Sequence, residues 1–173
     1  VFEAYPQTRW YQYDQLHNDN ALEGSRLAYG EPVTTRYDFS QADVIVSLGA
    51  DFLGEGPARI RYTKDFSRRR KVLSAENTMS RLYVMESTPT ITGVMADHRV
   101  TVRPSQIAAI AAYLAGEAGV AGAEGTLPEG LNAELIEALL ADLQGANGRS
   151  IVIAGDGEAP YVHALAHAVN NAL

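Results

Sequence analysis

Histidines are the first side chains to test for metal or acid–base chemistry. His163 and His167 lie four positions apart, a spacing that places both rings on one face of a helix and is compatible with zinc. The residues between them are Ala-Leu-Ala, without the glutamate of the HExxH metalloprotease helix, and the sequence offers no evident third ligand. We therefore expect structural or surface histidines. His98, between Asp97 and Arg99, is expected to be an ion-paired loop histidine.

Two glycine-rich loops could in principle hold a phosphate. Residues 49–56 spell G-x-x-x-x-G-x-G, which is not the dinucleotide pattern G-x-G-x-x-G, and a P-loop would need lysine where Glu55 stands. Asp51 and Glu55 also place negative charge where a phosphate would approach. The sequence favours a tight, solvent-facing turn here, and the same holds for Gly-Asp-Gly-Glu at 155–158.

Hydroxyl groups add little further chemistry. No serine lies in a G-x-S-x-G elbow, so hydrolase chemistry has no support. Ser87-Thr88-Pro89-Thr90 follows a predicted strand, where its hydroxyls could contact a ligand or could satisfy backbone groups in a turn. Composition and spacing alone therefore indicate a domain without an identifiable catalytic set.

Strands that alternate with helices must position these loops. The run Val44-Ile45-Val46 is apolar at successive positions, which suits a strand of a parallel sheet covered on both faces. With the loop that follows and a helix over 59–69, it forms half of a βαβ unit, and ligands bind at such loops. We expect an α/β fold with a doubly wound, mainly parallel sheet and helices on both faces. Further strands are expected over 8–13, 79–86, 100–102 and 150–154, and helices over 21–29, 92–96 (one turn), 106–114 with Ser105 as N-cap, from Asn132 to about 145, and 160–170.

Within the predicted helix over 59–69, the residues at helical spacing are Ile60, Tyr62 or Thr63, and Phe66. The run Arg68-Arg69-Arg70-Lys71 then ends this helix, where cations complement the helix dipole, and we prefer this interpretation to a binding patch. Residues 34–39 are expected to be irregular or a short strand, and 116–130 an exposed linker.

Composition indicates one globular domain over residues 1–173. The chain is 46% hydrophobic and 20% charged, and a net charge of −7 argues against a nucleic-acid or anionic-membrane surface. No apolar run approaches the roughly 18–20 residues of a membrane span. Cysteine is absent, which excludes disulfides, thiolate-held zinc, cysteine-ligated clusters and a cysteine nucleophile. Because the chain starts at Val1 without methionine, we expect a piece of a longer protein.

Two segments resemble a known family. ADVIVSLGADFLGEGP at 42–57 resembles a strand and loop of molybdopterin oxidoreductases of the dimethyl-sulfoxide-reductase type, and RLYVMESTPTITGVMADHRVTVRP at 81–104 resembles a later stretch of the same family. The resemblance covers about residues 10–114. More narrowly, residues 37–54, the basic run SRRRK and MSRLYVMESTPTITGVMADHR at 79–99 resemble the iron–sulfur subunit of alternative complex III, a membrane-associated assembly that oxidises quinol and passes electrons toward cytochrome c or an oxidase.

The narrower resemblance implies a region that lacks the molybdenum cofactor, with iron–sulfur clusters elsewhere in the parent chain. Departures from the pattern of the catalytic molybdopterin oxidoreductases agree with the loss of this cofactor. The loop asparagine of that pattern is replaced around Asp51-Phe52, and Ser105 and Ile107 replace a glycine and an acidic residue. We expect a non-catalytic structural domain without molybdopterin. If a pterin site persisted, its residues would be Gly49, Asp51, Glu86, Ser87, Thr88 and Arg103.

The resemblance also implies partners and a location. Its partners would be other domains of the same chain and subunits of a respiratory complex at the periplasmic face of the bacterial inner membrane, with no nucleic acid and no direct membrane insertion. Two alternatives stay open. One is a domain that holds half of a bis-guanine-dinucleotide cofactor in an active molybdenum or tungsten oxidoreductase, and the other is a free-standing nucleotide-binding module.

Overall fold

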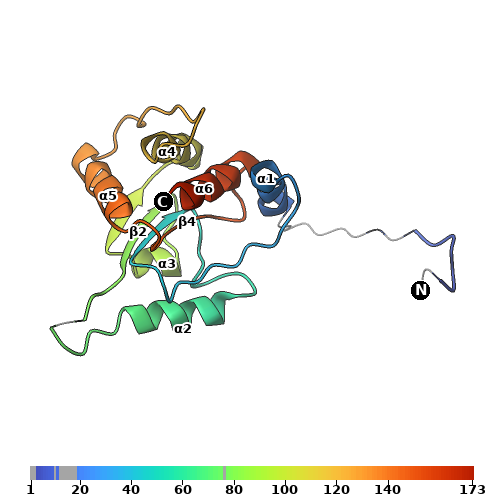
Figure 1. The fold of residues 1–173 in the computed structure, drawn as a ribbon, viewed down its shortest axis with the longest axis horizontal. Helices are drawn as coiled ribbons and strands as arrows, with labels where there is room; N and C mark the ends of the chain where they lie inside the picture. The colour runs from blue at the N-terminus through green and yellow to red at the C-terminus, as the bar shows by residue number, and fades with distance from the viewer. Residues whose placement is uncertain (1–2, 10, 12–18, 76) are drawn as a thin grey trace.

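A four-stranded, all-parallel sheet in the order β3-β2-β1-β4 forms the centre of the computed structural model (Figure 1). The structure describes residues 3–9, 11, 19–75 and 77–173. This sheet, with helices on both of its faces, confirms the predicted α/β fold. The strands are β1 (Val44–Leu48), β2 (Arg81–Glu86), β3 (His98–Thr101) and β4 (Ser150–Ala154).

The order of the strands fixes where the chain changes direction. Leu48 at the end of β1 lies beside Met85 of β2 on one side and Ala154 of β4 on the other. The chain runs outward from β1 through β2 to β3 and then returns to add β4 on the opposite side. The connections leaving β1 and β4 therefore diverge, which makes a topological switch point at their carboxyl ends.

Helices cover the two faces of the sheet unequally. Val44, Val46 and Leu48 face a large core that includes α4, α5 and α6, with α1 packed outside α6. Ile45 faces the second core, which includes Phe66 of α2, and α2 lies on the opposite side of the sheet from α4, α5 and α6 (Figure 1). The helices are α1 (Asp19–Tyr29), α2 (Arg59–Arg69), α3 (Ile91–Val94), α4 (Pro104–Glu117), α5 (Ala133–Gly145) and α6 (Pro160–Ala172).

The outer edge of β4 is partly closed by a side chain. The Asn170 side chain accepts a hydrogen bond from the Val152 N–H and donates one to the Val152 carbonyl, both at 2.7 Å. This amide takes the place of a neighbouring strand at one peptide group, which blunts an otherwise open sheet edge. None of the helices in the described ranges is long and apolar enough to cross a membrane.

Several predicted elements are confirmed at their ends. The helix over 59–69 and the strand over 150–154 have the predicted bounds. The side chain of Asn132 caps α5 by accepting the Leu135 N–H at 3.2 Å, and Pro160 occupies the first turn of α6. Residues 34–37 have no regular structure, as expected.

The helix predicted over 106–114 is wrong at both ends. Helix α4 starts at Pro104 with Arg103 as its N-cap, so Ser105 already lies inside the helix. Proline suits the first helical turn, where its missing N–H has no partner to lose. At the other end, α4 continues to Glu117 and the chain turns at Gly119, where φ is +80°.

Other boundaries also differ from the predictions. Of the residues at helical spacing in α2, Tyr62 and Phe66 are buried, whereas Ile60 is 78% exposed. The turn predicted over 92–96 is α3, and β2 and β3 start at 81 and 98. Residues 8, 9 and 11 of the strand predicted over 8–13 have no regular structure, and residues 10, 12 and 13 lie outside the described ranges. Leu127 packs on the large core, so the 116–130 linker is not wholly exposed.

Candidate ligand site at the switch point

A cavity of about 410 Å³ opens beside the carboxyl ends of β1 and β4. Its volume lies within the roughly 300–1,000 Å³ of small-molecule sites. The walls come from the loop over 49–58, the turn over 154–157, the segment over 33–37, and helices α1 and α6. The predicted ligand position, at the loop after the first buried strand, is therefore hollow.

Glycines bring the two loops of the switch point into direct backbone contact. The Gly49 N–H donates to the Met85 carbonyl at 2.8 Å, and Gly49 has a φ of +70°. A Cβ at Gly155 would lie less than 3.0 Å from the Gly49 carbonyl, so only glycine allows this approach. The predicted solvent-facing turn is wrong for the middle of the loop, because Phe52 and Leu53 are buried in the second core.

The charge on the cavity wall is one-sided. Among the described residues that line the cavity, Asp51, Glu55 and Asp156 carry carboxylates, and there is no lysine or arginine. His163 and His167 form part of the wall and are each only 5% exposed. Among the described lining residues, His163 and His167 are therefore the only side chains that could carry positive charge.

The histidines cannot supply that charge at neutral pH. Burial lowers the pKa of His163, against a smaller opposing effect of Asp156, and burial followed by the neighbouring His163 lowers the pKa of His167. Both rings are therefore mainly neutral at pH 7. Within the described ranges, His163 Nε2 is buried without a hydrogen-bond partner, and no group of three His, Asp or Glu residues could hold a metal ion. Of the structural and surface positions that the sequence leaves open, both rings occupy buried ones.

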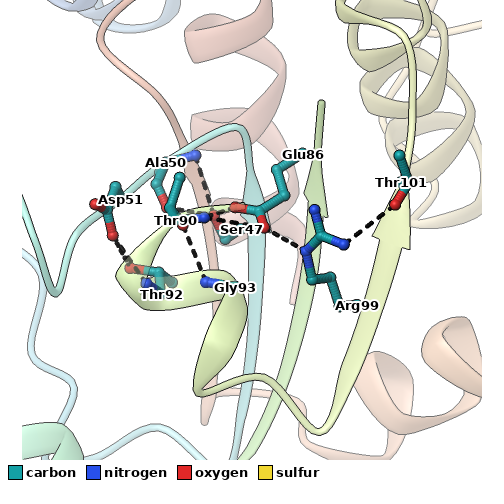
Figure 2. Close-up of polar contacts among 9 residues, drawn as sticks. All are labelled: Ser47, Ala50, Asp51, Glu86, Thr90, Thr92, Gly93, Arg99 and Thr101. Carbon is teal, nitrogen blue, oxygen red and sulfur yellow. Dashed lines mark hydrogen bonds and ion pairs between the residues drawn. The ribbon is translucent and has the colours of Figure 1, made fainter. Parts of the chain in front are cut away.

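The Asp51 carboxylate ties the loop after β1 to α3 (Figure 2). Its Oδ1 accepts hydrogen bonds from the Thr92 N–H at 2.9 Å and from the Thr92 hydroxyl at 2.7 Å. The Thr92 oxygen in turn accepts the Leu53 N–H at 3.0 Å. A Cβ at Gly54 would lie less than 3.0 Å from this carboxylate. Asp51 lines the cavity, but its Oδ1 is committed to the interior of the protein.

Glu86 forms the second tie, at the end of β2 (Figure 2). It is 3% exposed, and its Oε1 accepts the Arg99 Nε–H while its Oε2 accepts the Thr90 hydroxyl at 2.6 Å. Thr90 Oγ1 also caps α3 by accepting the Gly93 N–H at 3.0 Å. A Cβ at Gly93 would lie less than 3.0 Å from Glu86 Oε1, so the short helix packs directly on the carboxylate. Both oxygens of Glu86 therefore have internal partners.

The six residues that the sequence predicts for a persisting pterin site do not gather in one pocket. Gly49 and Asp51 line the cavity. Glu86 is buried beneath α3, Ser87 and Thr88 are exposed in the loop after β2, and Arg103 is exposed at the start of α4.

His98 also differs from its prediction. It lies in β3, where its ring stacks on the ring of Tyr83 at 4.7 Å between centroids, so the loop assignment is wrong. Sequence reasoning did not identify the walls that α6 and the segment over 33–37 contribute to the cavity. The one available signal was the spacing of His163 and His167 on a helix that follows a predicted strand.

No family model matches the chain, and no curated protein matches it.

Proposed function

We propose that this chain is a non-catalytic structural domain of a respiratory iron–sulfur subunit that resembles the one in alternative complex III. Its role is to pack against neighbouring domains and subunits and to position cluster-bearing partners during quinol oxidation and electron transfer. The clusters belong elsewhere in the parent chain, at the periplasmic face of the inner membrane. The observation that carries the proposal is the cavity wall, which has three carboxylates and, among the described residues, no lysine or arginine.

The pyrophosphate of a pterin nucleotide would meet unfavourable charge in this cavity. Two like unit charges ~6 Å apart repel by about 3 kcal/mol at an effective dielectric constant of ~20, and by less where water screens them, as at Glu55 and Asp156. The neutral His163 and His167 do not offset this repulsion. A bound pyrophosphate normally relies on cations or helix N-termini for the opposite effect.

The internal ties of Asp51 and Glu86 support an architectural role. Asp51 Oδ1 holds Thr92 of α3 against the loop that follows β1. Glu86 Oε2 holds Thr90, the N-cap of α3, and Glu86 Oε1 pairs with Arg99 of β3. Their place at the carboxyl ends of the strands is therefore explained without a ligand. At Asp51 this agrees with the resemblance, in which the loop asparagine of the catalytic pattern is replaced.

One observation favours a second candidate. A cavity of ligand size at the switch point of a doubly wound sheet is where such folds bind nucleotides. The second candidate is a molybdopterin guanine dinucleotide domain of an active molybdenum or tungsten oxidoreductase. A free-standing nucleotide-binding module would use the same cavity.

The metal and pterin content of the purified parent protein separates these candidates. Elemental analysis should find iron and less than stoichiometric molybdenum and tungsten, and oxidative release should yield no stoichiometric pterin. Stoichiometric molybdenum or tungsten would overturn the proposal in favour of the enzyme. Calorimetric titration of the 173-residue chain with guanine and adenine nucleotides should show no binding, and tight binding would favour the free-standing module.

A further inference from the structure

Positive charge is concentrated on one helix of an acidic chain. Seven of the 14 lysine and arginine residues lie within 59–71, which covers α2 and the residues just after it. This stretch contains one acidic residue, Asp65, and so contributes +6, which leaves −13 for the rest of a chain whose net charge is −7. The chain's only two lysines, Lys64 and Lys71, both belong to it.

Three of these seven cations form ion pairs, and two of the three pairs join α2 to the sheet. Arg69 pairs with Asp43 before β1, and Arg70 pairs with Asp97 before β3 at 2.9 Å. Arg61 pairs with Asp65 on the helix itself at 3.3 Å. Arg69 in the last turn and the C-cap residue Arg70 thus anchor α2 to the sheet, in addition to complementing its dipole.

Three other cations of this stretch are exposed and lack an ion-pair partner among the described residues: Lys64, Arg68 and Lys71. Spacings of four and four residues place Ile60, Lys64 and Arg68 along one stripe of the helix, and Lys71 follows its C-cap. We call Ile60, Lys64, Arg68, Lys71 and Leu73 the α2 face.

Large apolar side chains accompany the cations. Ile60 is 78% exposed and Leu73 is 76% exposed, and the neighbouring Val72 is 51% exposed. In Figure 1, α2 forms the outer layer on its side of the sheet, while α4, α5 and α6 cover the other side and α1 packs beyond α6. Exposed apolar side chains ringed by charge are typical of a protein-binding surface.

We propose that the α2 face docks onto an acidic, partly apolar protein surface of a neighbouring domain or subunit in the parent assembly. This inference rests on the proposed structural function. Charge complementarity selects a protein partner, because the −13 on the remaining residues repels an extended anionic surface such as a membrane or nucleic acid. A local acidic patch matches the three free cations, and the anchored helix presents them without reorganisation.

The rate of lysine acetylation measures how accessible the α2 face is, because both lysines of the chain lie on it. The purified parent assembly and its dissociated subunit are treated with an acetylating reagent, and modification of Lys64 and Lys71 is followed by mass spectrometry. We expect at least fivefold slower modification in the assembly, with zero-length carbodiimide cross-links from these lysines to Asp or Glu of another domain or subunit. Equal rates in both states would overturn the inference.

Charge reversal supplies a matched comparison. Lys64→Glu/Lys71→Glu should lower the yield of assembly at ~150 mM salt at least tenfold. Arg9→Glu/Arg36→Glu, at exposed sites that are not part of the α2 face, changes the net charge equally and should leave the yield unchanged. Both double variants should have the thermal midpoint of the wild-type subunit. Equal effects of the two double variants would overturn the inference, as would protection of the lysines only by self-association, anionic vesicles or DNA.

The outcomes separate this inference from the proposed function. Protected lysines in a protein that contains stoichiometric molybdenum would sustain the docking face and overturn the non-catalytic role. Freely reactive lysines in a molybdenum-free assembly would do the opposite.

Discussion

The tie between Glu86 and α3 makes a measurable prediction for Glu86→Gln. The glutamine keeps the size of the side chain but removes the negative charge that faces Arg99, and it presents an NH₂ group where one carboxylate oxygen accepts a hydrogen bond. The Glu86 side chain is 4% exposed and that of Arg99 is 29% exposed. Arg99 would therefore remain partly buried without its charged partner.

The magnitude follows from these burials. Hydrogen bonds to charged groups contribute roughly 1.5–3 kcal/mol, and breaking a fully buried pair costs roughly 3–5 kcal/mol. Because water reaches part of Arg99, we expect the lower range, about 2 kcal/mol. In urea this lowers the midpoint by about 1 M at an m value of ~2 kcal/mol/M, and it lowers Tm by roughly 4–8 °C.

The assay is equilibrium urea unfolding followed by circular dichroism, with the exposed Glu124→Gln as control. Amide hydrogen exchange should also accelerate at Gly93, whose N–H is held by Thr90. A loss of less than about 0.5 kcal/mol relative to the control would refute the reasoning that Glu86 is a structural tie, since exposed substitutions vary by that much.

Three further perturbations test other parts of the structure. Gly155→Ala should destabilise the fold by about 2–3 kcal/mol in urea unfolding because its Cβ would collide with the Gly49 carbonyl, whereas Gly157→Ala, with no atom within 4 Å of its Cβ, should not. Burial lowers the pKa of His163 and His167 in the folded protein. Their contribution to the free energy of unfolding is therefore complete above the pKa of histidine in the unfolded chain, about 6.5, and is lost as the pH falls below that value. The free energy of unfolding should fall as the pH drops below about 6.5, and a His163→Gln/His167→Gln variant should flatten that slope. An unchanged slope would contradict this prediction. Asn170→Ala should cost about 1–3 kcal/mol by leaving the Val152 peptide unpaired, with a lower thermal midpoint, and Asn171→Ala, exposed on the same helix, serves as its control.

The sheet was the part of the fold most open to prediction from sequence. Short runs of successive apolar residues, as at 44–46 and 150–154, indicate strands buried on both faces, and the helices between them imply parallel pairing. Strand order could not be obtained in the same way. The partner of β1 on one side is β4, which lies far along the chain, and nothing local in either segment specifies the other.

The candidate site was only partly predictable for the same reason. The glycines and carboxylates of the loop after β1 are visible in the sequence, but Asp51 finds its partner Thr92 41 positions away. The spacing of His163 and His167 predicts a shared helical face. It does not show that this face is buried, which depends on Gly24 of α1, where a Cβ would collide with the His163 side chain.

The pairing of β1 with β4 can form only after the ribosome has synthesised the residues between them. The ion pair between Asp43 and Arg149 at the start of these strands joins residues 106 positions apart. At roughly 5–20 residues per second, a ribosome needs about 5–20 s to deliver the second after the first. Through that interval one edge of β1 stays unpaired on the nascent chain. Chaperone contact or premature self-association would therefore act first on this strand.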